Sequence, residues 1–273
     1  MNNQCFRYSD HLPVTMSIGG LKFGSWNVLF QKWLIMNSGP KGDGHITKYF
    51  NQLATMDKTT RKTGILLTIY DLLKVQNISV LGLQEFDPSY LDDLKQLLYH
   101  LGNYEIVLPS DLNGYDKANE NTLTSKDSND LQIVIYHRAV IIHNVQKSHM
   151  EYYVNSSDGS KKIAKRIMNL SLSDADNVVE FRFINTHVLF MQMKQLVTYI
   201  NNIKKPSTQK ELYVIVVGDM NQTERPNDLQ GIPKDGTLTV YNGHDRMENL
   251  KYTHINTQGD YVMYDHIWWN IIK

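Results

Sequence analysis

Two apolar runs open the chain and predict a β-hairpin. The first has a period of two and leads to Gly19-Gly20, and the second follows at Phe23–Leu29. A pair of glycines between two such runs is typical of a two-residue turn, because both turn residues must adopt positive φ. Polar side chains interrupt this apolar pattern, with Asp10-His11 in the first segment and Asn27 in the second. The predicted hairpin therefore carries residues that are candidates for a functional site.

The rest of the chain alternates strand-length apolar runs with helical patterns. Strands are predicted at 78–83, 104–108, 131–136, 140–145, 150–154, 161–166, 178–185, 212–217 and 261–269. Helices are predicted at 63–75, 87–99 and 191–203, a long connection at 31–62 and a polar loop at 111–130. No repeat or low-complexity linker divides the chain. Residues 1–273 are therefore expected to form a single α/β sandwich domain, with two packed sheets and helices outside.

Composition narrows the function classes. The formal net charge of the 273-residue chain is zero, which argues against a protein that grips duplex nucleic acid with a broad basic face. The single Cys5 excludes an internal disulfide framework and a cysteine-based zinc site. The sequence shows no membrane span and no signal-peptide pattern at its start, so a cytoplasmic protein is expected. Secretion without a signal peptide stays open.

Polar side chains stand at the ends of the apolar strands. They are Asn27, Gln84-Glu85, His187, Asp219, Asn221 and Asp265. Strand ends at one edge of a sandwich converge, so these groups are expected to form one pocket together with Asp10-His11. Oxygen ligands without thiolates suit Mg²⁺ or Mn²⁺ better than zinc.

Each polar group also has a structural explanation when it is taken alone. Asn27 could satisfy local backbone at a bend. Glu85 could favour the start of the following helix through its dipole. His187 could be a hydrogen-bonded, partly buried imidazole, and Asp10-His11 a surface pair. It is their occurrence together that favours a functional site.

Six motifs together resemble the endonuclease/exonuclease/phosphatase superfamily, which has a deoxyribonuclease-like fold. They are Ser9-Asp10-His11-Leu12-Pro13-Val14, Phe23-Gly24-Ser25-Trp26-Asn27-Val28-Leu29, Leu81-Gly82-Leu83-Gln84-Glu85, Ile184-Asn185-Thr186-His187, Val217-Gly218-Asp219-Met220-Asn221 and Tyr264-Asp265-His266-Ile267. They span nearly the whole chain. The resemblance implies a four-layered α/β sandwich, in which two packed mixed β-sheets are flanked by helices.

The order of these motifs departs from the family in one respect. The Ser-Asp-His motif comes last in the family, but here it comes first and nothing after Asp265 replaces it. The chain thus resembles a circularly permuted member, in which Gly19-Gly20 joins the family's last and first strands. Domains tolerate such a change when their termini lie close together at the surface. The alternative is that residues 1–18 are an unrelated extension.

The resemblance implies a Mg²⁺ or Mn²⁺ site. Glu85 would be the principal metal ligand, supported by Asn27 and Asp10. In the family the histidine that corresponds to His187 often pairs with a carboxylate, and Asp130 is the candidate partner here.

The same resemblance implies roles for five catalytic residues. His11 would bind the scissile phosphate, and Asp265 would hydrogen-bond to its imidazole. Asp219 would orient and deprotonate the attacking water, while Asn221 would contact a phosphate oxygen and His187 would act near the phosphate or the leaving group. His11 and Asp265 are therefore predicted to lie within hydrogen-bonding distance, although they stand near opposite ends of the chain.

The function that the resemblance implies is hydrolysis of phosphodiester bonds. The first choice is a nuclease that acts on RNA, single-stranded nucleic acid or nucleotides. Residues 251–254 are similar to the deadenylase and 2′,5′-phosphodiesterase branch, and the Asn-Tyr-Arg ending of inositol polyphosphate 5-phosphatases is absent. The basic cluster at 161–166 is either a solvated hairpin or a phosphate contact. Three alternatives stay open: a phosphatase, a lipid phosphodiesterase, and a non-catalytic binding module with the same fold.

Overall fold

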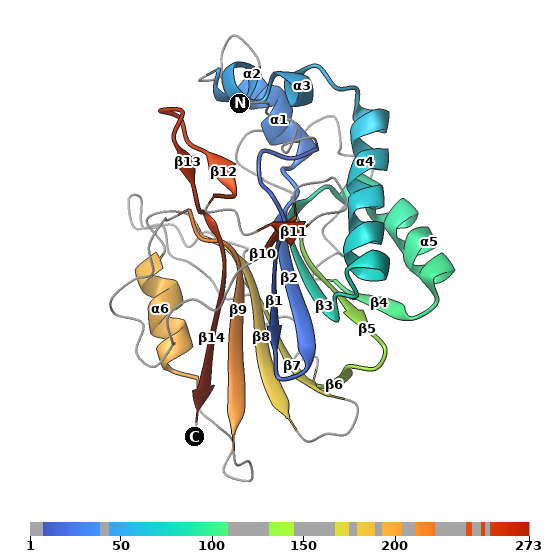
Figure 1. Cartoon of the computed structure of the whole chain (residues 1–273), viewed down its shortest axis with the longest axis vertical. Coiled ribbons are helices and arrows are strands. Elements are labelled where there is room, and N and C mark those ends of the chain that lie inside the picture. Colours follow the sequence, from blue (N-terminus) through green and yellow to red (C-terminus); the bar gives the residue numbers. More distant parts are fainter. Residues whose placement is uncertain are drawn as a thin grey trace, which may run out of the picture.

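The computed structural model describes residues 8–38, 44–108, 131–144, 167–174, 179–188, 193–203, 211–221, 239–241, 247–248 and 252–272. Two β-sheets pack face to face, and apolar side chains from both sheets form the core between them (Figure 1). The polar loop predicted at 111–130, the strand at 150–154 and the basic cluster at 161–166 lie outside the described residues.

The larger sheet has seven described strands and contains the hairpin. In spatial order they are β11 (Met247–Glu248), β10 (Thr239–Tyr241), β1 (Val14–Ile18), β2 (Leu21–Asn27), β3 (Val80–Phe86), β5 (Leu131–His137) and β4 (Tyr104–Val107). Strands β1 and β2 pair antiparallel around Gly19 and Gly20, whose φ angles are 56° and 81°. The predicted two-residue turn is confirmed. β2 and β3 pair in parallel, so the sheet is mixed.

The second sheet has five described strands. They are β14 (Asp265–Ile272), β9 (Leu212–Asp219), β8 (Glu180–His187), β7 (Ile167–Ser173) and β6 (Ile141–Asn144). β8 and β9 run in parallel while β9 and β14 run antiparallel, so this sheet is mixed as well. A small hairpin, β12 (His254–Ile255) with β13 (Tyr261–Val262), stands beyond the start of β14 (Figure 1).

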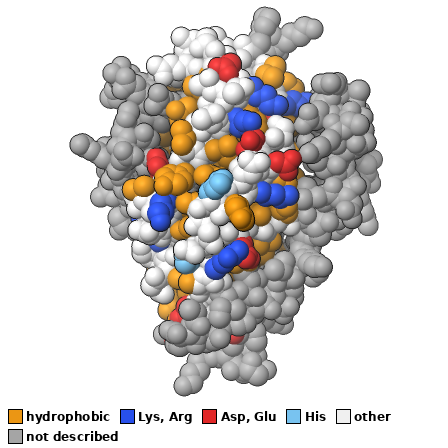
Figure 2. All heavy atoms as spheres, turned by 90° about the vertical axis from the view of Figure 1, so that its right-hand side faces the viewer, with side chains coloured by type: hydrophobic (Ala, Val, Ile, Leu, Met, Phe, Trp, Pro, Cys, Tyr) orange, Lys and Arg blue, Asp and Glu red, His pale blue; other side chains and the backbone are white. Residues whose placement is uncertain are grey.

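Helices cover the outer faces of both sheets, which gives four layers. α4 (Lys58–Tyr70), its π-helical continuation η2 (Asp71–Val75), the short η3 (Pro88–Tyr90) and α5 (Leu91–Leu101) cover the larger sheet, and α6 (Met193–Asn201) covers the smaller one (Figure 1). Figure 2 looks onto the α4–α5 side, where basic, acidic and apolar side chains are interspersed. The predicted α/β sandwich is confirmed. No described helix has the length and apolarity needed to cross a membrane.

The long connection predicted at 31–62 is wrong. This stretch forms α1 (Gln31–Ser38), α2 (His45–Tyr49) and α3 (Asn51–Ala54) before α4 begins. Each of the three helices buries a single apolar residue, namely Leu34, Ile46 and Leu53. Helices this short show no repeating apolar face, and that repeat is the signal by which a helix is predicted.

Strands β3 and β9 are buried on both faces. Leu81 and Leu83 of β3 pack toward the helices, whereas Val80 packs toward the other sheet. In β9, Val216 packs toward α6 and Val217 toward the interior. Burial on both faces explains why these strands are continuous apolar runs rather than alternating patterns.

One polar bridge crosses the core below the strand ends. Asn185 of β8 donates from Nδ2 to the carbonyl oxygens of Leu83 (3.0 Å) and Ile133 (2.9 Å) in the opposite sheet. Its Oδ1 accepts a hydrogen bond from Gln84 Nε2 at 2.5 Å. Gly82 permits this approach, because a Cβ there would lie 2.7 Å from Asn185 Oδ1. The bridge fixes the spacing of the sheets next to Glu85.

Candidate active site

An irregularity in β3 sets the direction of Glu85. The pairing of β3 with β5 shifts register between Leu83 and Phe86, and Glu85 has a φ of 53°. A left-handed backbone at a non-glycine residue costs about 1–3 kcal/mol and is often found at functional sites. Glu85 Oε1 lies 3.3 Å from His187 Nδ1, and Oε2 accepts a hydrogen bond from the Phe30 amide at 3.2 Å.

Asn27 ends β2 and links two carboxylates. Its Nδ2 donates to Asp219 Oδ2 at 3.0 Å and to Glu85 Oε1 at 3.3 Å. Its Oδ1 accepts a hydrogen bond from the Leu29 amide at 2.9 Å. The predicted metal ligands Asn27 and Glu85 therefore lie together, and Asp219 is in contact with them.

Asp219 ends β9 between two other predicted site residues. In the strand pairing it lies opposite His187 on one side and Asp265 on the other. Gly218 before it has a φ of 147°, and a Cβ there would lie 1.7 Å from the carbonyl oxygen of Thr186. Only glycine can deliver Asp219 at this point of the strand.

Asn221 lies beside Asp219, with its backbone in the left-handed region at a φ of 48°. Its amide donates to Asp219 Oδ1 at 2.9 Å, and its side-chain Nδ2 donates to the carbonyl oxygen of Val188 at 2.8 Å. The side chain is thus tied to the chain just after His187. Asn221 supports the Asp219 carboxylate through its backbone.

Two segments that are far apart in the sequence meet at His11 and Asp265. His11 Nδ1 and Asp265 Oδ2 are 2.7 Å apart, which confirms the predicted distance. Trp26 Nε1 donates to the His11 carbonyl oxygen at 3.0 Å. The Ser9 hydroxyl accepts from the His11 amide at 3.2 Å and donates to the Asn27 carbonyl oxygen at 2.7 Å. The Ser-Asp-His segment is therefore bound to β2 as well as to β14.

Two imidazoles flank Asp219. His11 Nε2 and His187 Nε2 each lie 3.6 Å from Asp219 Oδ2. His11 is paired through its other nitrogen with Asp265, and His187 through its other nitrogen with Glu85. Asp10 completes the group, with Oδ1 at 4.0 Å from His11 Nε2. All eight predicted site residues lie at this one edge of the sandwich.

Comparison with solved structures decides the fold. An endonuclease/exonuclease/phosphatase from Bacteroides vulgatus superposes with a TM-score of 0.54 at 14% identity, covering 94% of this chain and 87% of that one. A mannosyl-6-phosphatase from Bacteroides thetaiotaomicron gives a TM-score of 0.51 at 15% identity, with coverage of 92% and 85%. The human Nocturnin catalytic domain with a bound sulfate anion gives 0.50 at 14% identity, with coverage of 96% and 83%.

The chain has the endonuclease/exonuclease/phosphatase fold. No protein-family model and no curated protein matches the sequence. The resemblance drawn from the six motifs is therefore confirmed by three-dimensional structure, at the level of the fold.

Within this endonuclease/exonuclease/phosphatase fold, burial and neighbouring charges shift three pKa values at the site. Burial alone would lower the pKa of His11, but the carboxylates of Asp265 and Asp219 outweigh it and hold that pKa well above 6.5. Burial raises the pKa of Asp219 to about 6, against the opposing effect of His11. Burial and the charge of His11 lower the pKa of His254 to about 4. The imidazole of His11 is therefore protonated and positively charged at pH 7, whereas that of His254 is neutral.

The chemistry of the donor set fits a divalent cation. Asp10, Glu85 and Asp219 are all at least 90% buried, and protonated His11 lies within 4.0 Å of Asp10, Asp219 and Asp265. Buried carboxylates repel one another unless a cation offsets their charge. Carboxylate and amide oxygens are the ligands that Mg²⁺ and Mn²⁺ prefer.

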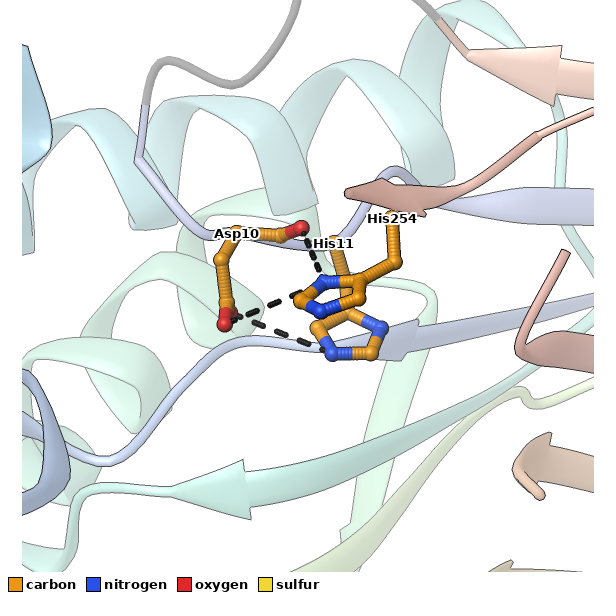
Figure 3. A group of neighbouring side chains, drawn as sticks. All are labelled: Asp10, His11 and His254. Carbon is orange, nitrogen blue, oxygen red and sulfur yellow. Dashed lines mark hydrogen bonds and ion pairs between the residues drawn. The ribbon is translucent and has the colours of Figure 1, made fainter. Parts of the chain in front are cut away.

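His254 was not predicted as a site residue. Figure 3 shows its ring against His11 and beside Asp10, and the two rings stack with centroids 4.4 Å apart. The donor atoms of these three residues lie within 4.8 Å of one another. His254 Nδ1 donates to the Asp10 carbonyl oxygen at 2.9 Å, so this nitrogen carries the proton and Nε2 keeps its lone pair. The similarity of residues 251–254 to one branch of the family was the available signal.

Asp130, the candidate partner for His187, lies outside the described residues. Among the described residues, the carboxylates of Glu85 (3.3 Å) and Asp219 (3.6 Å) lie next to His187. Arg61 was also missed by sequence reasoning, because it lies in the stretch that was expected to be a connection.

Proposed function

We propose that this protein is a divalent-metal-dependent phosphoester hydrolase, and specifically a phosphodiesterase acting on RNA, single-stranded nucleic acid or nucleotides. The observation that supports this most strongly is the buried convergence of oxygen ligands and imidazoles around Asp219. Phosphoester hydrolysis concentrates negative charge on the phosphate, so it requires cationic groups and a base held close together. A purely structural edge of a sandwich has no need of such a set.

Glu85, Asn27 and Asp10 would hold Mg²⁺ or Mn²⁺. The metal supplies charge stabilisation at a phosphate oxygen without a proton transfer. The chain prepares this ligand set in advance. The amides of Leu29 and Phe30 orient Asn27 Oδ1 and Glu85 Oε2 before any ligand binds.

The other groups divide the work on the phosphate and on the water. His11, held as a cation by Asp265, would donate from Nε2 to a phosphate oxygen. Asp219 would take the proton of the attacking water, since a pKa of about 6 suits a general base near neutral pH. In this assignment Asn221 contacts a phosphate oxygen and His187 acts beside the phosphate or the leaving group.

Aromatic rings beside the phosphate position support a nucleotide substrate. The His254 ring stacks on His11 and also on Tyr264, whose centroid is 5.3 Å away, and on Phe50 at 5.8 Å. His11, His254 and Phe50 are buried in this stack, so partly exposed Tyr264 is the ring available to a nucleobase, since bases stack on aromatic side chains with little sequence preference. The zero net charge agrees with a short or single-stranded substrate rather than a duplex.

A phosphomonoesterase is the second candidate. It is favoured by the similarity to a structure described as a mannosyl-6-phosphatase, at a TM-score of 0.51. The sulfate anion in the Nocturnin structure is compatible with either activity, because sulfate is a tetrahedral anion like phosphate.

We also propose that the fold is circularly permuted. β1 pairs with β2 across the Gly19-Gly20 turn, and the segment before it supplies Asp10 and His11. The expectation of neighbouring termini needs correction: Asp265 begins β14 beside His11, but Ile272 ends the strand about 23 Å away at 3.3 Å per residue. In a relative with the usual motif order, the connection from the end of the strand that corresponds to β14 back to the Ser-Asp-His motif would have to span at least this distance.

A cleavage panel tests the proposed function. The purified chain is assayed with Mg²⁺, Mn²⁺ or EDTA on single-stranded RNA, single- and double-stranded DNA, 2′,5′-linked and cyclic dinucleotides, phosphoinositides and sugar phosphates. We expect metal-dependent cleavage of single-stranded RNA or dinucleotides that EDTA abolishes. Release of phosphate from sugar phosphates alone would establish the second candidate. No hydrolysis together with no metal-induced thermal shift would favour a non-catalytic binding module.

A further inference from the structure

Arg61 of α4 is a fully buried arginine that binds carbonyl and amide oxygens and also contacts the Tyr90 hydroxyl. Its Nε donates to the Tyr8 carbonyl oxygen at 3.0 Å, and its Nη1 donates to Gln31 Oε1 at 2.9 Å. Its Nη2 donates to the carbonyl oxygens of Val28, at 2.5 Å, and Leu29. Arginine is rarely buried completely, and the five fixed donors of its planar fork suit it to binding several carbonyls at once.

The two peptide groups that Arg61 binds face the metal-ligand side chains at their other ends. The peptide that joins Val28 to Leu29 presents its carbonyl to Arg61 and its N–H to Asn27 Oδ1, at 2.9 Å. The next peptide presents the Leu29 carbonyl to Arg61 and the Phe30 N–H to Glu85 Oε2, at 3.2 Å. Because C=O and N–H point in opposite directions in a trans peptide, Arg61 and the two ligands lie on opposite sides of one turn.

This arrangement has two physical consequences. A cation on the carbonyl side polarises each peptide, which strengthens the hydrogen bond that its N–H donates on the other side. In addition, Leu29 has a φ of 55°, a conformation that leucine rarely adopts, so something must hold the turn in place. The Arg61 contacts on both sides of Leu29 do so.

Arg61 also reaches the second half of the proposed metal site. The Tyr8 carbonyl that it binds lies two residues before Asp10, and the Ser9 hydroxyl between them donates to the Asn27 carbonyl oxygen. One guanidinium therefore fixes both the Tyr8–Asp10 segment and the turn after β2.

We propose that Arg61 is a positioning residue for the divalent cation: it holds the 27–30 turn so that Asn27 and Glu85 present their oxygens together, and it anchors the segment that carries Asp10. This inference rests on the metal-dependent function proposed above. Removing groups that orient metal ligands typically lowers metal affinity by about 10–100-fold.

The test is Mn²⁺ binding, measured by electron paramagnetic resonance of the free ion, with the metal dependence of kcat as a second readout. Arg61→Lys keeps the charge but loses the planar fork, and Arg61→Met loses both. Lys62→Ala is the matched control, because Lys62 is the next residue of α4 and pairs with Asp93 at the surface (2.8 Å). Circular dichroism establishes that each variant is folded.

We expect Arg61→Lys to weaken Mn²⁺ binding about 10-fold or more, with kcat approaching the wild-type value at saturating metal. Lys62→Ala should bind Mn²⁺ as the wild type does. Leu29→Gly adopts the positive φ at this position without strain, so in the Arg61→Lys background it should recover part of the lost Mn²⁺ affinity, and it extends the test if Arg61→Met does not fold. A folded Arg61→Lys protein with wild-type Mn²⁺ affinity would overturn the inference. A wild-type protein that binds no Mn²⁺ would instead overturn the proposed function.

Discussion

The space between the two sheets and the edge above it are equally buried but follow opposite chemical rules. Between the sheets, Phe23, Phe183 and Val217 are fully buried and apolar. At the edge, Asp219 and Asp265 are at most 2% exposed, yet they are carboxylates beside imidazoles. Burying charges costs stability unless they are well paired, so folding alone does not account for the edge.

The contrast separates the residues that stabilise the fold from those that serve a function. The interior is explained by packing, whereas the edge is explained by a ligand that its groups would bind. Substitutions should therefore separate the two regions. Changes at the edge should remove activity with little loss of stability, and changes in the interior should do the reverse.

The largest effect is expected at the edge, from Asp219→Asn. The loss of a general base typically costs about 10²–10⁴-fold in rate, so turnover should nearly vanish. Burial raises the pKa of Asp219, which means that its charged form already costs stability in the fold, and a neutral isostere should not lower the melting temperature. Steady-state kinetics and thermal unfolding of the same preparation measure both. Metal-dependent turnover at the wild-type rate would remove Asp219 from the mechanism.

In the interior, Phe183→Ala should have the opposite profile. Phe183 is fully buried in β8 and stacks against Phe23 with ring centroids 5.9 Å apart. A large-to-small change of this kind costs about 3–5 kcal/mol. Urea unfolding should report that loss, while kcat per folded molecule stays close to that of the wild type. A stable variant with lost activity would contradict the separation of the two regions.

A substitution in the polar bridge of Asn185 tests whether the interior and the edge are independent, because the bridge lies between them. Asn185→Ala removes the hydrogen bonds to the Leu83 and Ile133 carbonyl oxygens and from Gln84 Nε2, and a buried polar group left unsatisfied costs about 1–3 kcal/mol. Because Gln84 precedes Glu85, we also expect a modest loss of metal affinity. Unfolding curves and Mn²⁺ titration measure the two effects separately. A change in stability without any change in metal binding would confine the bridge to a packing role.

The smallest effect is expected at the hairpin turn, in Gly20→Ala. Gly20 has a φ of 81° and open space around its Cβ position, so the cost comes from the backbone alone. A residue with a Cβ loses about 1–2 kcal/mol in a left-handed conformation. Gly20→Asn, which tolerates this region better, is the control and should lose less. Equal melting temperatures for the wild type and both variants would show that the turn is not constrained.

Much of the sandwich could be predicted from sequence because its signals are local. Continuous apolar runs indicate strands buried on both faces, and two adjacent glycines fix the turn of the first hairpin. The polar groups at strand ends then indicate the edge where they meet. The His11–Asp265 contact was predicted from the family resemblance, since nothing local to either residue predicts it.

What sequence reasoning missed depends on contacts between distant segments. The helices α1 to α3 each bury one apolar side chain, so they leave no periodic pattern. Arginine is a common residue on helix surfaces, so nothing in the sequence marks Arg61 as buried. Its role depends on carbonyl groups from two other segments. His254 gains its place by stacking on His11, which is far away in sequence.

A double-mutant cycle at His11 and Asp265 tests most directly the claim that these two residues, 254 positions apart in the sequence, act in one catalytic site. The metal-dependent kcat/KM is measured for the wild type, His11→Ala, Asp265→Ala and the double variant. Residues that act as a unit are strongly non-additive, so the double variant should be about as impaired as the worse single variant. Losses that multiply, as for two independent residues, would contradict the account.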